Sequence, residues 1–264
     1  MDLLTLAPFG MRVTGLRVGP LDAQVADALA RLLGEHGVLV LPAQHDVGDD
    51  AFVSFLASFG ELTFTQGETP VVGHPDLNVV SNVGRTTPPR STFHVDTSYV
   101  SHPPAYTALR AVQVPAQGGQ TVFSDQYRAF ETLPPDLLEL LSGRSIRHVV
   151  TGVKLDDGDQ GEAEHPVLRV HPLTGRTSLY LTSPARCAAI TGLSEQETAE
   201  TVALLLEHST RPDNLYRHAW SAGDVVMWDN GCVLHRADHE GVVGDRVMHR
   251  GMSLGYALAG RHAG

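Results

Sequence analysis

A histidine and an aspartate one residue apart, His94 and Asp96, are suited by type and spacing to bind a metal ion. On a strand, residues two apart point to the same face, so the imidazole and the carboxylate would reach one cation together. A third ligand must come from elsewhere, and we place it at His235. Two histidines and one carboxylate on one face of an octahedral ion leave three positions open, as in non-haem Fe(II) oxygenases.

Two arginines, Arg246 and Arg250, would share one face if their segment forms a strand. A guanidinium inside a barrel is costly unless an anion meets it, and arginine binds carboxylate, sulfonate or phosphate through two parallel hydrogen bonds. A Gly-Gly turn precedes Thr121, whose hydroxyl can also donate to an anion. The alternative for the two arginines is a structural role, in which they pair with Asp or Glu at a barrel mouth. The alternative for the Gly-Gly segment is an ordinary β-hairpin turn.

The spacing of Cys232, His235 and His239 also occurs in zinc sites. A closed zinc site needs a fourth ligand, however, and it would leave the first two metal-ligand candidates and the arginine pair without a role. The alternative to an enzyme is a binding protein that keeps the same fold but catalyses no reaction. We interpret Cys232 and Cys187 as reduced thiols of the core or the cavity wall.

The elements that must position these residues are mostly short strands. Apolar runs between Gly, Pro, Asn and Asp clusters predict strands over 38–41, 77–81, 106–114, 121–124, 167–171, 178–182, 224–228 and 246–254. Helices are predicted over 22–36 and 49–59, after Pro134-Pro135, and after Ser194, which forms a capping box with Glu197. This pattern predicts a mainly β fold with flanking α-helices, in a single domain over 1–264.

The composition sets outer limits on function. The chain has 264 residues, of which 42% are hydrophobic, and this is enough for a packed core. The net charge of −11 argues against a nucleic-acid partner, because phosphate binding needs a basic face. No apolar run reaches the roughly 18 residues of a membrane helix, and no secretory signal is recognisable. We therefore expect a cytoplasmic protein without a membrane or nucleic-acid partner.

Four segments in order resemble the taurine dioxygenase family, whose members are Fe(II)- and 2-oxoglutarate-dependent oxygenases. They are FHVDTSY, GGQTVFSD, GDVVMWDNGCVLHRADH and DRVMHR. The similarity extends from the first predicted helix to about residue 255, and this order of motifs is more specific than any one motif. The resemblance implies a double-stranded β-helix, which is a jelly roll of the cupin type and agrees with the strand-rich pattern.

The resemblance also gives each candidate residue a role. The matching positions are His94, Asp96 and His235 for iron, Thr121 and Arg246 for the distal carboxylate of 2-oxoglutarate, and Arg250 for the anionic group of the substrate. The chain departs from the taurine enzyme at Thr65, which replaces a substrate-binding histidine, at Arg90, which replaces an asparagine, and in the segment 182–187. Taurine is therefore not the expected substrate.

The substrate pocket is expected to include Thr65, Arg90, Tyr99 and His102, because the last three flank the segment of the first iron ligands. A second cation at Arg90, beside Arg250, indicates a substrate with two acidic groups or a double charge. In this family the pocket is formed by loops, here around 63–92 and 152–165. The second loop is acidic and glycine-rich, and we expect a mobile lid there.

The implied reaction oxygenates a C–H bond of a small anionic substrate, namely a carboxylate, sulfonate, sulfate or phosphate. The reaction consumes 2-oxoglutarate and O2 and releases succinate and CO2. The alternative is a natural-product hydroxylase that acts on an amino acid or a nucleotide. Because relatives often form dimers or tetramers, the resemblance also implies a homodimer or a homotetramer.

Overall fold

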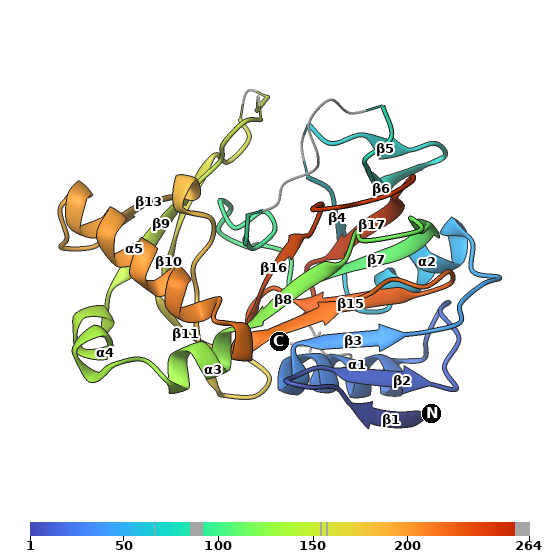
Figure 1. The fold of residues 1–264 in the computed structure, drawn as a ribbon, viewed down its shortest axis with the longest axis horizontal. Helices are drawn as coiled ribbons and strands as arrows, with labels where there is room; N and C mark the ends of the chain where they lie inside the picture. Colours follow the sequence, from blue (N-terminus) through green and yellow to red (C-terminus); the bar gives the residue numbers. More distant parts are fainter. Residues whose placement is uncertain (66, 85–91, 154, 157, 257–264) are drawn as a thin grey trace, which may run out of the picture.

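The computed structural model describes residues 1–65, 67–84, 92–153, 155–156 and 158–256, and its centre is a large, mostly antiparallel sheet (Figure 1). The strands of this sheet follow the order β1 (Asp2–Thr5), β2 (Met11–Thr14), β3 (Val38–Leu41), β15 (Val225–Asp229), β7 (Tyr106–Gln113), β17 (Val247–Ser253), β6 (His74–Ser81) and β5 (Pro70–Val71). The short strand β4 (Leu62–Thr63) also pairs with β17. Strand β17 therefore has partners along both of its edges.

A smaller sheet packs against the middle of the large one. It contains β14 (Leu215–His218), β8 (Thr121–Asp125) and β16 (Val233–Ala237). Apolar side chains from the two sheets, such as Phe123 of β8 and Trp228 of β15, fill the space between them, because alternate residues of each strand point inward. This is the jelly-roll architecture that the sequence predicted.

Two helices, α1 (Ala23–His36) and α2 (Asp49–Ala57), cover the outer face of the large sheet. Helix α1 begins where the carboxylate of Asp22 accepts the amide hydrogen of Val25 at 2.9 Å, and it ends at Gly37, whose φ is +73°. Both helices bury an apolar stripe against the sheet, which explains why periodicity predicted them correctly.

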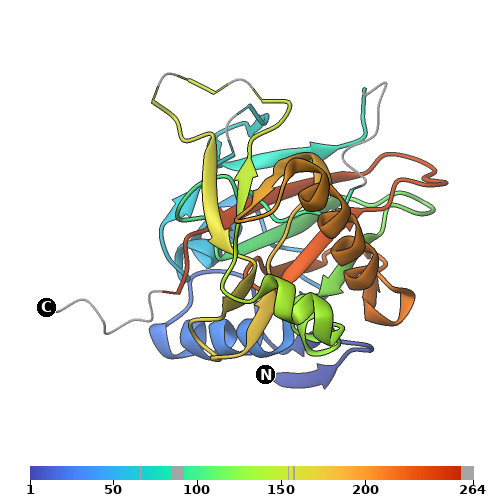
Figure 2. The same cartoon turned by 90° about the vertical axis from the view of Figure 1, so that its left-hand side faces the viewer.

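A third group of elements stands at the left of Figure 1 and faces the viewer in Figure 2. It comprises the sheet of β10 (Glu162–Pro166), β9 (Ser145–Val149) and β13 (Cys187–Ile190), the pair β11 (Leu168–Val170) and β12 (Thr177–Leu179), and the helices α3 (Gln126–Glu131), α4 (Pro135–Leu141) and α5 (Glu195–Ser209). Helix α5 has the predicted Ser194–Glu197 capping box. Of the helices in the described ranges, none is long and apolar enough to cross a membrane.

The strands that were not predicted are β1, β2, β4, β5, β9, β10, β13, β14 and β16. Strand β10, for example, has the sequence Glu-Ala-Glu-His-Pro, whose residues have little intrinsic preference for a strand. Its pairing with β9 stabilises the strand in spite of this sequence. Because β10 occupies 162–166, the loop between β9 and β10 is shorter than the lid predicted over 152–165. That loop projects at the top of Figure 2.

Gly251 of β17 lies directly against helix α2, so we expect Gly251→Ala to destabilise the protein. A methyl group there would collide with Leu56 of α2 and lie 2.8 Å from Cδ2 of Leu77. Overpacking of this kind costs about 1–3 kcal/mol, which chemical denaturation would measure. The control is Gly19→Ala, because nothing lies within 4 Å of the added methyl group there. Equal stability of the two variants would contradict this account of the packing.

His148 of β9 is buried, its ring stacks on Tyr180 with centroids 5.6 Å apart, and neither ring nitrogen has a hydrogen-bond partner. Burial lowers the pKa of His148 from 6.5 to about 3. The unfolded chain therefore binds the proton more readily, and stability is lost as the pH falls from 6.5 towards 3. We expect His148→Phe to flatten this acid limb by roughly 1.4 kcal/mol per pH unit. Unfolding of the metal-free protein at several pH values measures the slope, and identical slopes would contradict the assignment.

Candidate active site

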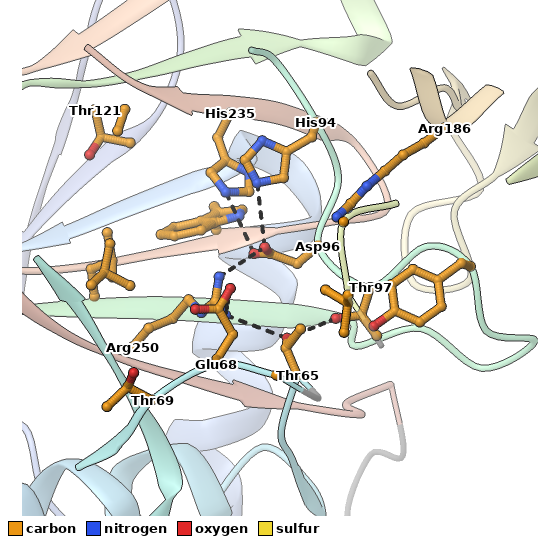
Figure 3. A pocket seen from close by; sticks show the side chains of 18 of the residues that line it. Thr65, Glu68, Thr69, His94, Asp96, Thr97, Thr121, Arg186, His235 and Arg250 are labelled. Carbon is orange, nitrogen blue, oxygen red and sulfur yellow. Dashed lines mark hydrogen bonds and ion pairs between the residues drawn. The ribbon is translucent and has the colours of Figure 1, made fainter. Parts of the chain in front are cut away.

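His94, Asp96 and His235 come together in a cavity of about 310 Å³ that is lined by residues of both jelly-roll sheets (Figure 3). Nε2 of His94 is 3.6 Å from Oδ1 of Asp96, and Nε2 of His235 is 3.5 Å from Oδ2. These separations exceed ordinary N–H···O hydrogen bonds, whereas one cation bound by all three groups would satisfy them together. Among the described residues, this is the one cluster of three His, Cys, Asp or Glu ligand atoms that lie within 4.8 Å of one another.

The predicted strand through His94 and Asp96 is wrong, although both residues reach the predicted site. His94 forms an isolated bridge with His235 of β16, through two backbone hydrogen bonds of 3.0 Å. The chain then turns at Asp96, where Thr97 has a φ of 48°. The bridge brings the two imidazole rings to a centroid distance of 4.3 Å, and the turn directs the carboxylate towards them.

The surrounding hydrogen bonds orient the three groups. Nδ1 of His94 donates to the carbonyl oxygen of Thr92 at 2.9 Å, which leaves the Nε2 lone pair towards Asp96. The hydroxyl of Thr107 on β7 donates to Oδ2 of Asp96 at 2.9 Å. The ring of His235 packs against Trp228 of β15, with centroids 4.5 Å apart.

The protonation states also suit a metal. Burial alone would raise the pKa of Asp96, but the neighbouring side chains of His235, Arg250 and His94 hold this pKa well below its usual value. Burial lowers the pKa of His235 to about 3, so that imidazole is neutral. An ionised carboxylate and a neutral imidazole are the forms in which these side chains bind metal ions.

A second buried site can bind an anion in the same cavity. Arg246, which immediately precedes β17, is 1% exposed, and burial lowers its pKa to about 10. Its Nε donates to the carbonyl oxygen of Gly119 at 2.8 Å, and its Nη2 donates to Oγ1 of Thr121 at 3.3 Å. Its Nη1 has no hydrogen-bond partner, and no carboxylate of the described residues forms an ion pair with it. A buried cation of this kind favours an anionic ligand.

The hydroxyl of Thr121 can donate a hydrogen bond to the same anion. It accepts hydrogen bonds from Arg246 and from Nε1 of Trp220, the latter at 3.0 Å, so its own hydrogen is available to donate. Gly119 has a φ of +71°, and a Cβ there would lie 3.0 Å from the Arg246 side chain. The predicted Gly-Gly turn therefore gives the guanidinium the room it needs.

Arg250 points into the cavity but already has acidic partners. Its Nη1 is 3.3 Å from Oδ1 of Asp96, and its Nη2 is 3.7 Å from Oε1 of Glu68. Nη2 also donates to Oγ1 of Thr65 at 3.4 Å and to Oδ1 of Asn78 at 3.3 Å. Sequence analysis missed Glu68, since a glutamate in a loop carries no distinguishing signal.

The other expected substrate residues are only partly brought together. Thr65 and Tyr99 line the cavity. His102 is exposed and lines a smaller neighbouring pocket, which shares Tyr99 with the first. Arg90 lies outside the described residues. A cation that sequence analysis missed, Arg186, also lines the cavity; its segment, 182–187, was noted only as a departure from the taurine enzyme.

The zinc alternative is not favoured by the geometry. Cys232 and His239 are not members of the cluster that contains His235. Cys232 is buried, and burial raises the pKa of its thiol well above the usual value, which opposes the thiolate form that zinc requires.

Comparison with known proteins identifies the family. Residues 4–252 match the family model described as taurine catabolism dioxygenase TauD, TfdA family. The chain belongs to this family. It is therefore a 2-oxoglutarate-dependent dioxygenase with a jelly-roll fold, and the family, the fold and the enzyme class predicted from the sequence are all confirmed.

Individual relatives cover most of the chain. The alpha-ketoglutarate-dependent 2,4-dichlorophenoxyacetate dioxygenase of Cupriavidus pinatubonensis is 32% identical over 87% of this chain and 88% of its own length. Pentalenolactone F synthase of Streptomyces arenae is 29% identical over 94% and 93%. The solved structure of a taurine dioxygenase from Burkholderia xenovorans is 29% identical, with a TM-score of 0.83 over 96% of this chain and 89% of that chain.

We expect Asp96→Gly to weaken divalent-metal binding by more than about 100-fold, because loss of a direct ligand exceeds the 10- to 100-fold effect of losing an outer partner. Titration of the metal-free protein with Co(II), followed by visible absorption, measures the affinity. The control is Asp213→Asn, since Asp213 forms a surface ion pair with Arg128. Unchanged affinity in the Asp96 variant would mean that this carboxylate is not a ligand.

Proposed function

We propose that this protein is an Fe(II)- and 2-oxoglutarate-dependent dioxygenase that oxygenates a C–H bond of a small organic substrate with an anionic group, releasing succinate and CO2. The observation that carries the proposal is the joint presence, in one cavity, of the His94–Asp96–His235 cluster and the buried Arg246–Thr121 pair. The first suits a divalent cation with open positions, and the second suits a carboxylate.

In this proposal His94, Asp96 and His235 hold the iron. When bound, the iron supplies O2 activation coupled to the oxidative decarboxylation of 2-oxoglutarate. A solved relative of 26% identity and TM-score 0.83 was crystallised, by its title, with Mn(II) and N-oxalylglycine, an analogue of 2-oxoglutarate. This supports a shared place for metal and keto acid.

Arg246 and Thr121 bind the distal carboxylate of 2-oxoglutarate. The guanidinium supplies the charge through Nη1 and Nη2, and the hydroxyl donates one more hydrogen bond. Leu109 and Val80 line the same cavity and keep water from the keto acid.

The substrate occupies the part of the cavity lined by Thr65, Tyr99, Arg186 and Arg250. These side chains must hold the target carbon close to the metal and keep other carbons away. Relatives named for a sulfate ester and for a sulfonate support an anionic group on the substrate. We place that group at Arg250, with Arg186 as a further cation in the wall.

A natural-product hydroxylase is the second candidate, because one relative is named pentalenolactone F synthase. Both candidates use the same metal and keto-acid sites and differ only in the substrate. A single domain over 1–264, a cytoplasmic location and a homodimer or homotetramer remain predictions.

Anaerobic addition of Fe(II) and 2-oxoglutarate tests the proposed function. We expect a metal-to-ligand charge-transfer absorption in the visible region, which requires both ligands in one site. Tight zinc binding without this absorption would instead support the zinc alternative.

We expect Arg246→Gln to weaken 2-oxoglutarate binding by about 100-fold, since a charge-assisted pair of hydrogen bonds is worth roughly 3 kcal/mol. The measurement is the 2-oxoglutarate dependence of the charge-transfer absorption. Fe(II) affinity should stay within about twofold of wild type, because Arg246 forms no ion pair with the cluster. Arg217→Gln is the control, since Arg217 pairs with Asp238 at the surface. Equal 2-oxoglutarate affinity in both variants would remove Arg246 from the site.

A further inference from the structure

The carboxylate of Asp96 stands in a turn, so its direction must be fixed by neighbouring side chains. Figure 3 shows it directed towards the imidazoles of His94 and His235, which are 3.6 and 3.5 Å away. Those distances are too long for good hydrogen bonds. Of the hydrogen bonds that described residues make to this carboxylate, the shortest comes from the hydroxyl of Thr107 on β7, whose Oγ1 is 2.9 Å from Oδ2.

Thr107 belongs to a chain of three hydrogen bonds. Nε1 of Trp228 donates to Oδ1 of Asn230 at 3.3 Å, and Nδ2 of Asn230 donates to Oγ1 of Thr107 at 2.8 Å. The hydroxyl of Thr107 then donates to Asp96. Each of the four side chains is 3% exposed or less, so bulk water does not offer them other partners. The chain therefore connects the turn after β15 to β7 and then to Asp96.

The chemistry of these groups allows the chain only one direction. An indole N–H can only donate, so it faces the carbonyl oxygen of the Asn230 amide and leaves the amide N–H groups for Thr107. A hydroxyl that accepts such an N–H keeps its own hydrogen for the carboxylate of Asp96, which in its ionised form only accepts. The amide of Asn230 thus orients the Thr107 hydroxyl, and the hydroxyl in turn orients the carboxylate.

The same hydrogen-bonded chain also supports His235. The indole of Trp228, at the start of the chain, packs against the ring of His235 with centroids 4.5 Å apart. The backbone N–H of Asn230 donates to the carbonyl oxygen of Ala105 at 2.8 Å, two residues before Thr107. The main chain and the side chain of Asn230 therefore both attach the turn between β15 and β16 to the segment that carries Thr107.

We propose that Asn230 and Thr107 are positioning residues that hold the carboxylate of Asp96 in the orientation in which it binds the metal, and that Asn230 acts through Thr107. This inference rests on the proposed function, because it takes Asp96 as a metal ligand. Neither Asn230 nor Thr107 lines the cavity, so their effect reaches the metal only through the side chains that they orient. Loss of such outer partners typically weakens metal binding by about 10- to 100-fold.

The first test removes the Thr107 hydroxyl in the full, metal-free chain, which is then titrated with Co(II) and followed by visible absorption. We expect Thr107→Val to weaken Co(II) binding by about 10- to 100-fold, whereas Thr107→Ser, which keeps the hydroxyl, should stay within about threefold of wild type. The control is Thr198→Val, since Thr198 is also buried and its hydroxyl accepts the backbone N–H of Ile190 at 3.2 Å. This control should keep the wild-type affinity.

The second test asks whether Asn230 acts through Thr107. We expect Asn230→Leu to weaken Co(II) binding by about 3- to 10-fold, because the Thr107 hydroxyl is then free to rotate away from Asp96. In the Thr107→Val background the same substitution should cause no further loss beyond about twofold. The control is Asn214→Leu, since Asn214 is a buried asparagine whose amide donates to the carbonyl oxygen of Asp125 at 2.9 Å. It should leave the affinity unchanged.

The outcomes separate this inference from the proposed function. It is overturned if Thr107→Val binds Co(II) as tightly as wild type, if Thr107→Ser binds as weakly as Thr107→Val, or if Asn230→Leu adds its full loss in the Thr107→Val background. The proposed function then stands, because wild type still binds the metal. If wild type does not bind Co(II), the proposed metal site fails and this inference fails with it.

Chemical denaturation of each metal-free variant shows whether it is folded. Should Thr107→Val not fold, the comparison of Asn230→Leu with Asn214→Leu decides, and equal Co(II) affinities would overturn the proposal. If Thr107→Val and Asn230→Leu both fail to fold while Asn214→Leu folds, the hydrogen-bonded chain serves the fold instead of the metal site, and the proposal is again overturned.

Discussion

The buried carboxylate of Asp96 is the group on which the architecture of the cavity depends. Its negative charge is stabilised by the hydroxyl of Thr107 on β7 and the guanidinium of Arg250 on β17, and it faces the imidazoles of His94 and of His235 on β16 at 3.6 and 3.5 Å. A buried charge needs such partners, so both sheets of the jelly roll must hold their register for the site to exist.

Arg246, which immediately precedes β17, and Arg250, in the middle of that strand, have different partners although they face the same cavity. Arg246 and Arg250 are four residues apart and both line the cavity, because side chains on one face of extended backbone recur at every second residue. Arg246 has no acidic partner among the described residues, whereas Arg250 faces two carboxylates of the protein. In the proposed function, this difference in partners assigns Arg246 to the keto acid and Arg250 to the substrate.

Sequence patterns predicted the cluster of His94, Asp96 and His235 better than the backbone that carries it. The types and order of these residues were sufficient to predict that they meet, because two histidines and one carboxylate are a recognisable set of metal ligands. The strand through the first two residues was wrong, since a turn at Asp96 follows a single bridge rather than a ladder. Such tertiary pairing leaves no periodic trace in the sequence.

The residues of the proposed substrate part of the cavity were predicted least well. Thr65 and Tyr99 were placed correctly in the cavity, but Glu68 and Arg186 were missed. Glu68 lies in a loop and Arg186 in the short 3-10 helix Pro184–Arg186, where hydrophobic periodicity does not predict which way a side chain points. The proximity of Glu68 to Arg250 is visible only in the structure. For this reason, the residues of loops that line a site are harder to predict from the sequence than the strands between which the loops run.

The chain has two tryptophans, and each contacts a different residue that lines the cavity. Trp228 packs against the ring of His235, and Nε1 of Trp220 donates to the hydroxyl of Thr121. The indole emission of the protein therefore comes from two side chains that contact His235 and Thr121. Without any label, fluorescence quenching would report on a paramagnetic ion beside one indole and on a dicarboxylic acid beside the other.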